Sequence, residues 1–438
     1  MNATTPVNQR VARGVHAVRR AMAIIAMQCS GALGLSAPLP PGSLGPRGVA
    51  RFGDDRFYLQ ALGRYGPVFK VLWNRNLAVC IVGFDRARHL LALHGRALAQ
   101  LTIDITPLVP AGFLRGMPRE EHDAYRKLIL TAMRNELAVG CASSLRDLIR
   151  LELTALAHRS DGHSLLDQPQ LTPCLHRLAT RCLLIAFFGE RPGDAAFTAL
   201  ERGFDDLSTD GVVVNPGAPQ RQGFTHLRAC LEALLVRPRP AGSATAVSVL
   251  DRLAALADPR ATDQTMIGNL VYMIELGRYD IRSLLRWVVK HLSDQPALDA
   301  SLARACVLET LRLEQIDTLN REATTDIEFE GFRIPAGAAV RVLLRESQRD
   351  PTAFNEPDSY RPCRFAADPP SSRDYAPFGL GEHRCVAADF VVDFATMFVE
   401  ELLNGFTWTV VSDGPSEKRS HNWEPAADFE IALRPKVA

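Results

Sequence analysis

The stretch PFGLGEHRCVA, residues 377–387, determines how the rest of this 438-residue sequence is interpreted. Gly379 and Gly381 allow backbone conformations that a Cβ atom would forbid. An amphipathic run follows from Val386 to Leu403, with apolar residues at helical spacing. Because a helix N-terminus favours negative charge, Cys385 is placed where a thiol ionises readily and can bind a metal. The alternative is a buried structural cysteine after a glycine turn.

The loop resembles the haem-ligand signature of the cytochrome P450 family, Phe-x-x-Gly-x-(Arg/His)-x-Cys-x-Gly. The matching residues are Phe378, Gly381, His383 and Cys385, while Ala387 replaces the last glycine. The resemblance implies that Cys385 is the axial ligand of a haem b iron and that Phe378, Gly379 and Gly381 shape the loop around this cofactor. It also implies a mainly α fold with small β-sheets, a helix-rich triangular prism with the haem between a long central helix and the helix after the cysteine.

Length alone would suggest about three domains, but no linker divides the chain. We therefore expect an N-terminal extension and Pro-rich connector at residues 1–44 and a single haem-binding catalytic domain at residues 45–438. The extension is basic and then apolar, from Ala21 to Leu35. That run is too short and too interrupted for a spanning helix of ~20 residues. We expect a cytoplasmic protein, with a targeting or membrane-associated segment as the alternative.

The net charge of the chain and the spacing of its cysteines limit the possible partners and the cellular compartment. The net charge of +1 indicates neither nucleic acid nor an anionic membrane as a partner. Nine cysteines include no C-x-x-C pair, which fits a reducing compartment better than a disulfide framework or a zinc site. Only five of the 50 basic residues are lysine, which indicates a GC-rich bacterial gene.

The order of the predicted elements also matches the family. The pattern predicts a helix at 54–65, a hairpin at 68–82 turning at 74–76, a helix at 85–94 and helices within 143–190. It then predicts a helix end and a loop from Phe204 to Gly223, a helix at 224–236 and hairpin strands at 327–345. Residues 98–116 are punctuated by proline and glycine. The resemblance implies that they cover the substrate with an apolar wall; the alternative is an ordinary surface loop.

Four basic residues are candidates for holding the two haem propionates. His122 and Arg126 lie four residues apart, so they share one face of a predicted helix. The resemblance assigns both to the propionates through charge-assisted hydrogen bonds, and it adds Arg321 and His383. Without the family, the spacing of His122 and Arg126 is common on solvated helices.

A further signature lies upstream of the cysteine. Glu309 and Arg312 share a helix face, and Glu309 precedes Cys385 by 385 − 309 = 76 residues. The resemblance joins them to Arg364 of a Pro-x-Arg-Phe segment. It implies a buried structural ion network, and such networks persist only if they are fully hydrogen-bonded. Taken alone, the first two residues would be read as a surface pair.

The longest predicted helix runs from Asp263 to Leu292, about 45 Å. Gly277 in its middle costs ~1 kcal/mol relative to alanine, which suggests close approach by a flat ligand. Family members that cleave O2 carry an acid followed by a threonine here; aligned on Gly277, these positions hold Tyr279 and Asp280. The three residues are our catalytic candidates. Asp280 could relay protons, steer a cationic or hydroxyl-bearing substrate, or serve as acid–base; alternatively it pairs with an arginine and takes no part.

The resemblance implies a haem-thiolate monooxygenase that oxidises a small, largely apolar natural product, using O2 and electrons from a ferredoxin or reductase. Because Tyr279 and Asp280 replace the usual acid and threonine, a haem-thiolate enzyme that does not activate O2 is the alternative: a peroxygenase, an isomerase or a dehydratase. A non-catalytic haem-binding protein is the third possibility.

Overall fold

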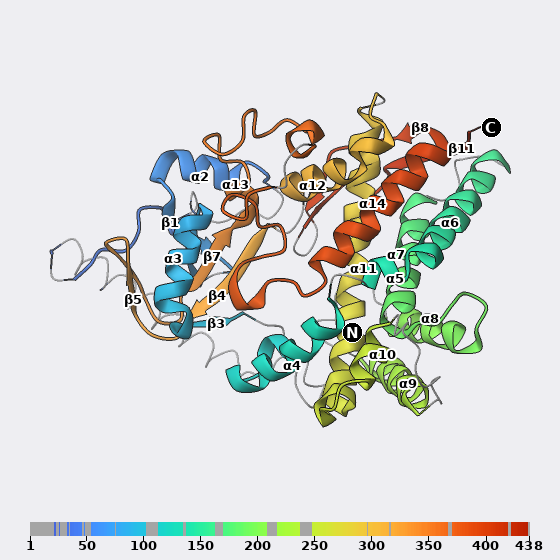
Figure 1. Ribbon diagram of the computed structural model, residues 1–438. Coiled ribbons are helices and arrows are strands. Elements are labelled where there is room, and N and C mark those ends of the chain that lie inside the picture. Colours follow the sequence, from blue (N-terminus) through green and yellow to red (C-terminus); the bar gives the residue numbers. More distant parts are fainter. Residues whose placement is uncertain are drawn as a thin grey trace. The chain divides into compact units, whose positions relative to one another are not determined.

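The computed structural model describes residues 36–45, 54–74, 76–101, 113–134, 137–162, 170–207, 217–236, 248–295, 297–314, 317–366, 370–418 and 422–436, with a few isolated positions before residue 49. Its elements are drawn in Figure 1. The chain divides into two compact units: residues 1–101 with 318–347 form unit 1, and residues 102–317 with 348–438 form unit 2. That residues 45–438 form a single domain stays a prediction.

Unit 1 is built on a five-stranded sheet with the strand order β1-β2-β7-β4-β3. The strands are β1 Val68–Trp73, β2 Asn76–Ile81, β3 Leu98–Gln100, β4 Thr318–Ala323 and β7 Ala339–Leu343. The predicted hairpin is confirmed, because β1 and β2 pair antiparallel and Asn74 adopts a φ of 48° at the turn. The parallel pairing of β2 with β7 joins the two chain segments of this unit.

Two predicted helices and a small hairpin complete unit 1. The additional elements are α2 Phe57–Tyr65, α3 Phe84–His94, η2 Gly95–Ala97, α13 Leu344–Ser347, and the antiparallel strands β5 Ile327–Phe329 and β6 Phe332–Ile334. The Pro-rich connector packs here, since the Pro38 carbonyl accepts from Arg333 N–H and the Pro41 carbonyl accepts from Lys70 N–H. Nearly all of the basic and apolar segment before residue 36 lies outside the described residues.

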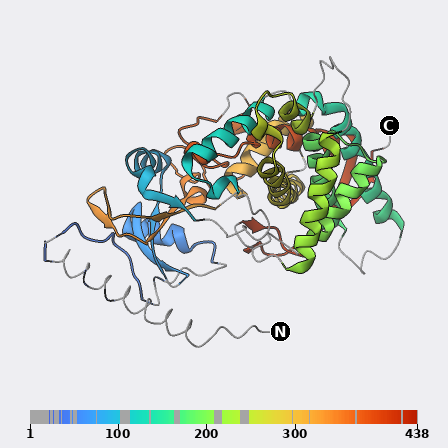
Figure 2. The ribbon, with the colours of Figure 1, turned by 90° about the horizontal axis from the view of Figure 1, so that it is seen from below.

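Unit 2 is helical and centred on α11, Gln264–Ser293, which Figure 2 shows nearly end-on. Asp263 caps this helix, since its Oδ1 accepts a hydrogen bond of 2.8 Å from Met266 N–H. The other helices are α4 Arg119–Ala132, α5 Leu137–Gly140, α6 Ala142–Gly162, α7 Leu171–Phe188, α8 Ala195–Leu207, α9 Ala218–Leu235, α10 Val249–Ala254, α12 Ala303–Glu314 and α14 Ala388–Gly405. Short 3₁₀ turns are η3 Leu114–Gly116, η4 Pro259–Thr262, η5 Ala300–Leu302, η6 Pro362–Phe365 and η7 Gly381–His383.

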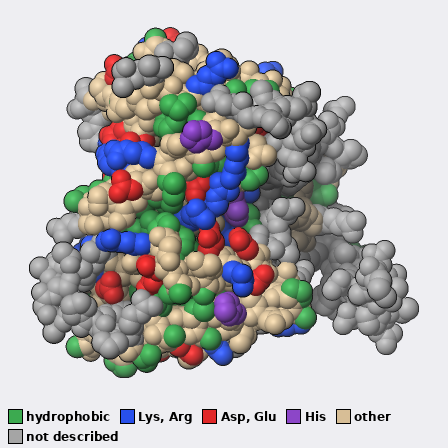
Figure 3. Space-filling view, turned by 90° about the vertical axis from the view of Figure 1, so that its right-hand side faces the viewer, with side chains coloured by type: hydrophobic (Ala, Val, Ile, Leu, Met, Phe, Trp, Pro, Cys, Tyr) green, Lys and Arg blue, Asp and Glu red, His purple; other side chains and the backbone are tan. Residues whose placement is uncertain are grey.

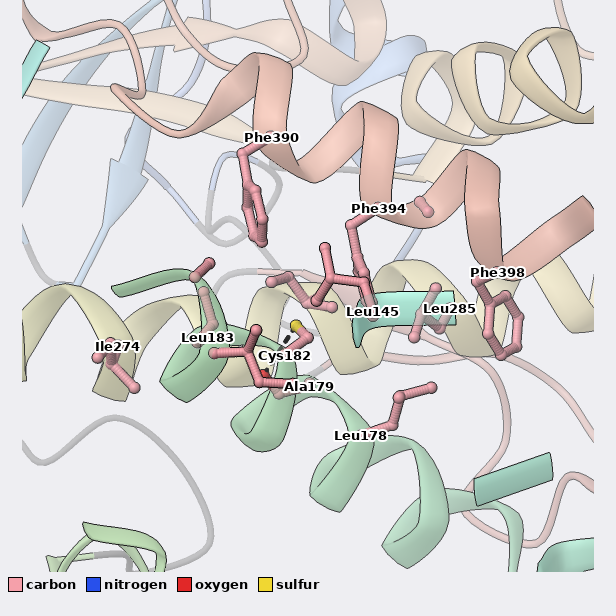
Figure 4. Close-up of a cluster of buried hydrophobic side chains, with 14 of the residues drawn as sticks. Leu145, Leu178, Ala179, Cys182, Leu183, Ile274, Leu285, Phe390, Phe394 and Phe398 are labelled. Carbon is pink, nitrogen blue, oxygen red and sulfur yellow. Dashed lines mark hydrogen bonds between the residues drawn. The ribbon is translucent and has the colours of Figure 1, made fainter. Parts of the chain in front are cut away.

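The core of unit 2 lies where α7, α11 and α14 meet. Figure 4 shows Leu183 of α7, Ile274 of α11 and Phe394 of α14 converging on it. By length and composition α7 could cross a membrane, but 72% of that stretch is buried inside the protein. A core helix accounts for its apolar character.

Short strands near the C-terminus also belong to unit 2. They form two antiparallel pairs, β8 Phe406–Ser412 with β11 Glu430–Pro435, and β9 Glu417–Lys418 with β10 Trp423–Glu424. The Glu430 carboxylate accepts hydrogen bonds from the backbone N–H groups of Gln170 and Leu171, at 2.8 and 2.9 Å. It therefore satisfies amides at the start of α7 that the helix itself leaves open.

The predicted loop from Phe204 to Gly223 is wrong in its second half, because α9 begins at Ala218; residues 208–216 lie outside the described residues. Gly217 takes the N-cap position and a proline follows in the first turn, where its missing N–H is harmless. A Cβ at Gly203 would lie 2.6 Å from Leu227 Cδ2. Glycine at that position lets α8 approach α9 instead of forming a turn.

Opposite charges are interspersed on the surface that Figure 3 draws. In unit 2, for example, Glu401 accepts hydrogen bonds from Arg146 and Arg150 at 2.8 and 2.7 Å. This mixing of signs agrees with the net charge of +1.

Candidate functional site

The cysteine loop is closed by a backbone hydrogen bond of 3.0 Å from Cys385 N–H to the Phe378 carbonyl. Gly379 and Gly381 adopt φ values of 83° and 70°, in the left-handed region that glycine occupies without strain. The expectation that Cys385 itself opens the following helix was wrong, since α14 begins at Ala388. The cysteine lies just before the helix, in the turn that the two glycines make possible.

The environment of Cys385 influences the ionisation of its thiol. The residue keeps exposed surface, yet burial is the largest cause that raises the pKa of the thiol. A hydrogen bond from Ala387 N–H lowers the pKa, and the nearby Asp280 carboxylate raises it again. Binding of a metal cation would draw the proton off such a thiol.

One face of α11 looks toward Cys385. Met273, Leu276, Gly277 and Asp280 keep partial exposure, whereas residues 274, 275, 278 and 279 are buried. The spacing of the exposed four places them on a single helix face. Because the Asp280 carboxylate raises the pKa of the Cys385 thiol, Asp280 on this face lies near the cysteine loop.

Apolar side chains provide much of the lining around this face. Phe113, Met273, Leu276, Phe378 and Val386 are only partly buried and pack against the main core. Phe113 is also fixed from α11, since its ring lies 4.2 Å from that of Tyr272. Leu114 N–H donates to Asn269 Oδ1 at 2.7 Å. The rest of the predicted apolar wall, residues 102–112, lies outside the described residues.

Asp280 is held from the C-terminal part of the chain. Asn422 Nδ2 donates to Asp280 Oδ1 over 3.3 Å. The segment that contains Asn422 is also hydrogen-bonded to α11, because Glu424 accepts from Arg282 and Arg286 at 2.9 and 3.0 Å. Trp287 Nε1–H also donates to the Trp423 carbonyl, at 2.8 Å. Sequence reasoning missed Asn422, because nothing near it in the sequence marks it as part of a site.

The surroundings of Tyr279 and Gly277 differ from those of Asp280. The Tyr279 ring is buried 5.1 Å from the His176 ring, with the guanidinium groups of Arg278 and Arg282 each 5.2 Å from its centroid. The structure therefore does not bring it together with Cys385. A Cβ at Gly277 would meet Leu183 Cδ1 at 3.4 Å, an ordinary contact, so protein packing does not require glycine there.

Three of the four propionate candidates lie beside the cysteine loop. His122 is 3% exposed, and its ring centroid is 4.5 Å from that of His383. Arg126 Nη2 donates to the Arg384 carbonyl at 2.6 Å. Burial lowers the pKa of Arg126, and the neighbouring Cys385 opposes this change. Arg321 belongs to β4 in unit 1, where its Nη1 donates to Gln100 Oε1 at 3.1 Å.

The structure joins Glu309, Arg312 and Arg364. Both nitrogens of the Arg312 fork donate to the Glu309 carboxylate, at 2.8 and 2.9 Å, and Arg364 Nε donates to Glu309 Oε1 at 2.9 Å. Arg312 Nη1 donates to two backbone carbonyls as well. Glu309 and Arg312 are 0% exposed, so this buried network meets the requirement for full hydrogen bonding.

This donor set fits a haem. A thiol is presented on a glycine loop, and a backbone N–H supports its sulfur. Three basic side chains stand beside the loop, which suits the two propionates. The face of α11 that looks toward the thiol is largely apolar, which suits a flat hydrophobic ring.

Comparison with known proteins agrees with this fit. Residues 292–436, which include the Glu309 network and the cysteine loop, match the family described as Cytochrome P450. Over this stretch the chain is similar to the cytochrome P450 family. Abscisic acid 8′-hydroxylase 2 of Oryza sativa subsp. japonica is 24% identical over 429 residues, covering 85% of this chain and 82% of the hydroxylase.

Solved structures show the same fold. Retinoic acid-bound cyanobacterial CYP120A1 matches with a TM-score of 0.70 and 18% identity, covering 92% of this chain and 100% of the cyanobacterial protein. A zebrafish cytochrome P450 with abiraterone matches with a TM-score of 0.67 and 16% identity, covering 87% and 99%. The predicted fold class, oxidoreductase class and haem cofactor are confirmed.

Proposed function

We propose that this protein is a cytochrome P450 monooxygenase that oxidises a small, largely apolar molecule with O2 and electrons from a ferredoxin or reductase. The observation that carries the proposal is the placement of Asp280 on the face of α11 that looks toward Cys385. When bound, the haem supplies O2 binding and activation at an iron ligated by the Cys385 thiolate. The names of the relatives, which describe hydroxylation and oxidation, support this class.

The chain's own residues hold the cofactor in this proposal. The Cys385 thiolate would bind the haem iron, and the cysteine is positioned by its hydrogen bonds with the Phe378 carbonyl and Ala387 N–H. His122, Arg126 and His383 would neutralise the propionates, and the role of Arg321, in unit 1, stays a prediction from the sequence. Burying two carboxylates without partners would be costly, so these basic groups decide how firmly the cofactor is retained.

Asp280 serves as the proton-handling group on the substrate side. Its carboxylate accepts from Asn422 and keeps partial exposure. Gly277, one turn before it, leaves room on the same face. Tyr279, packed against His176, has no part in this role. The apolar residues Phe113, Met273 and Leu276 support a substrate with few polar groups. A natural-product substrate and a bacterial, cytoplasmic setting stay predictions.

A second candidate function rests on the same residues. Asp280 occupies the position of the usual threonine, and Tyr279, at the position of the usual acid, packs against His176. That arrangement suits a haem-thiolate enzyme that uses a peroxide, or that rearranges or dehydrates its substrate with Asp280 as acid–base.

Oxygen labelling distinguishes the two functions. The holoenzyme is supplied with isotope-labelled O2 and a ferredoxin system, or with unlabelled peroxide alone, and products from an apolar compound library are analysed by mass. A monooxygenase incorporates label from O2, and the Asp280→Asn variant loses most of that product. Product that forms only with peroxide, or without any incorporated oxygen, would replace the proposal with the second candidate.

A further inference from the structure

The residues just before α4 are held against the first half of α11. Leu114 N–H donates to Asn269 Oδ1 at 2.7 Å, and the Phe113 ring lies 4.2 Å from the Tyr272 ring. Asn269 is 0% exposed, and the nitrogen of the same amide donates to a backbone carbonyl of α11. Arg115 is the next residue, in η3, so these contacts fix the position of its backbone along α11.

The Arg115 guanidinium acts on two groups at the candidate site. Burial raises the pKa of the Cys385 thiol and the pKa of the Tyr272 hydroxyl, and the positive charge of Arg115 lowers both. Because interactions between charges weaken with distance, Arg115 lies near the cysteine loop as well as near α11. Its side chain is exposed, so a ligand can reach the guanidinium.

The positive charge of Arg115 is not compensated by the described part of the chain. Its side chain makes no hydrogen bond and no ion pair with the described residues. Two other arginines near Cys385 differ in this respect: the Arg384 guanidinium lies 3.9 Å from the Asp389 carboxylate, and Arg126 donates to the Arg384 carbonyl at 2.6 Å. Arg115 is therefore free to bind an anion without breaking a contact within the protein.

The lining of α11 next to Arg115 is apolar. Tyr272 and Asp280 are 280 − 272 = 8 residues apart, about 12 Å along the helix at 1.5 Å per residue. Met273 and Leu276 lie between them and keep partial exposure. A ligand with an anionic end at Arg115 thus meets apolar side chains before it reaches Asp280.

We propose that Arg115 binds the carboxylate of an apolar acid that is the substrate. A guanidinium presents paired N–H donors that match the two oxygens of a carboxylate, and these hydrogen bonds are charge-assisted. A haem propionate is a second possible carboxylate, but His122, Arg126 and His383 already lie beside the cysteine loop for that role. This role for Arg115 rests on the proposed function, which places the substrate along this face of α11, and it adds the chemical class of that substrate.

The test is a titration of the ferric holoenzyme with three probes that share one carbon chain: dodecanoate, its methyl ester and dodecanol. The pH is chosen so that the acid is ionised. Dissociation constants come from the Soret change and from equilibrium dialysis, so a probe that leaves the iron spectrum unchanged is still measured. Because its hydrogen bonds to Arg115 are charge-assisted, dodecanoate should bind at least about tenfold more tightly than either neutral probe.

Matched variants locate the effect. Arg115→Gln should lose the preference for the acid while its affinity for dodecanol stays that of the wild type, which shows that the variant is folded. Arg115→Lys should keep part of the preference, because lysine retains the charge but not the planar fork. Arg202→Gln, which removes an exposed arginine of α8, should keep all of it. Equal affinities for acid and neutral probes in the wild type, or an unchanged preference in Arg115→Gln, would overturn the proposal.

Haem transfer to apomyoglobin distinguishes the two sources of a carboxylate. Arg115→Gln should release haem at the wild-type rate, because the propionates have other partners. Release as fast as from Arg126→Ala would assign Arg115 to a propionate and would overturn its role in substrate binding.

The proposed function fails in different measurements. Without the thiolate-type carbon monoxide band, or without incorporation of label from O2, the monooxygenase assignment falls, whereas an acid preference that Arg115→Gln removes would stand. A normal band and normal incorporation with no preference for dodecanoate would refute only the role of Arg115.

Discussion

Glu275 and Arg278 form an ion pair inside unit 2 in which both side chains are 0% exposed and the nitrogen–oxygen distance is 2.5 Å. The guanidinium of Arg278 lies 5.7 Å from the centroid of the Phe204 ring and 5.2 Å from that of Tyr279. Burial raises the pKa of Glu275 to about 7, although Arg278 lowers it. A charge pair sealed in this way makes stability depend on pH.

We predict that replacing Glu275 with Gln changes how stability responds to pH. The folded-state pKa of Glu275, about 7, lies above its ordinary value of 4.5. Between these values the folded chain keeps a proton that the unfolded chain releases, so the contribution of Glu275 to the free energy of unfolding falls as pH rises. Relative to Glu275→Gln, the wild type should lose on the order of 3 kcal/mol across that window in denaturant titrations.

The measured quantity is the difference in free energy of unfolding between wild type and Glu275→Gln. A difference is needed because the titration of His176 changes the stability of both proteins with pH in the opposite direction. Burial, with Arg278 and Arg282, lowers the pKa of His176 to about 3, so its stabilisation is lost as pH falls below 6.5. Wild type and Glu275→Gln both lose the His176 contribution, so it cancels when their free energies of unfolding are subtracted. Glu328→Gln on β5, an exposed acid, is the control. Parallel stability curves for wild type and Glu275→Gln would contradict the prediction.

Cys385→Ala should abolish thiolate ligation. In the wild type, the ferrous carbon monoxide complex should show the strongly red-shifted Soret band that a thiolate ligand produces. The variant should lack this band even when haem is retained. Cys363→Ser, which changes another exposed cysteine, should keep it. A histidine-type spectrum from fully loaded wild type would show that Cys385 is not the ligand.

Arg126→Ala should weaken haem retention. The side chain donates to the Arg384 carbonyl next to Cys385, and its loss would leave propionate charge poorly compensated. Transfer of haem from the holoprotein to apomyoglobin should be at least several-fold faster in the variant. Arg88→Ala in α3, a surface residue paired with Asp85, provides the matched control. Equal transfer rates in the two variants would remove Arg126 from the propionate set.

Glu309→Ala should be among the most destabilising single changes in the chain. It would leave Arg312 buried without its carboxylate, and breaking a buried pair from one side costs about 3–5 kcal/mol. Chemical denaturation of the variant against wild type gives the difference. Glu356→Ala removes a carboxylate that pairs with Arg361 at the surface and should cost far less. A loss below 1 kcal/mol for Glu309→Ala would mean that the network is dispensable.

Local sequence patterns located the cysteine loop and the Glu309 network only together with the family resemblance. The two glycines before Cys385 have left-handed φ values, and Glu309 and Arg312 are three residues apart on one helix, so local geometry accounts for these parts. Arg364 joins Glu309 from 55 residues away, and the resemblance alone indicated it. The start of α9 was misjudged because glycine and proline were read as turn formers. Gly217 instead takes the N-cap position of α9, and the proline occupies the first turn, where it costs little.

Asn422 could not have been found in this way. It meets Asp280 across 142 residues of sequence, and the strand that follows it is two residues long, which is too short for any periodic pattern. Its role depends on Glu424 and Trp287 fixing the segment along α11. Such a contact follows from the tertiary course of the chain, which periodicity does not encode.

The hydrogen bonds from Gln170 and Leu171 to Glu430 have a consequence for biosynthesis. The carboxylate that satisfies the start of α7 is translated about 260 residues after that helix. At roughly 5–20 residues per second, the ribosome needs about 13–50 seconds to reach it. During this interval the apolar helix α7 has left the exit tunnel, and the Glu430 carboxylate that accepts from the N–H groups at its start has not yet been made. We expect it to be the segment of the nascent chain that chaperones engage first, and the one that drives aggregation when translation stalls before Glu430.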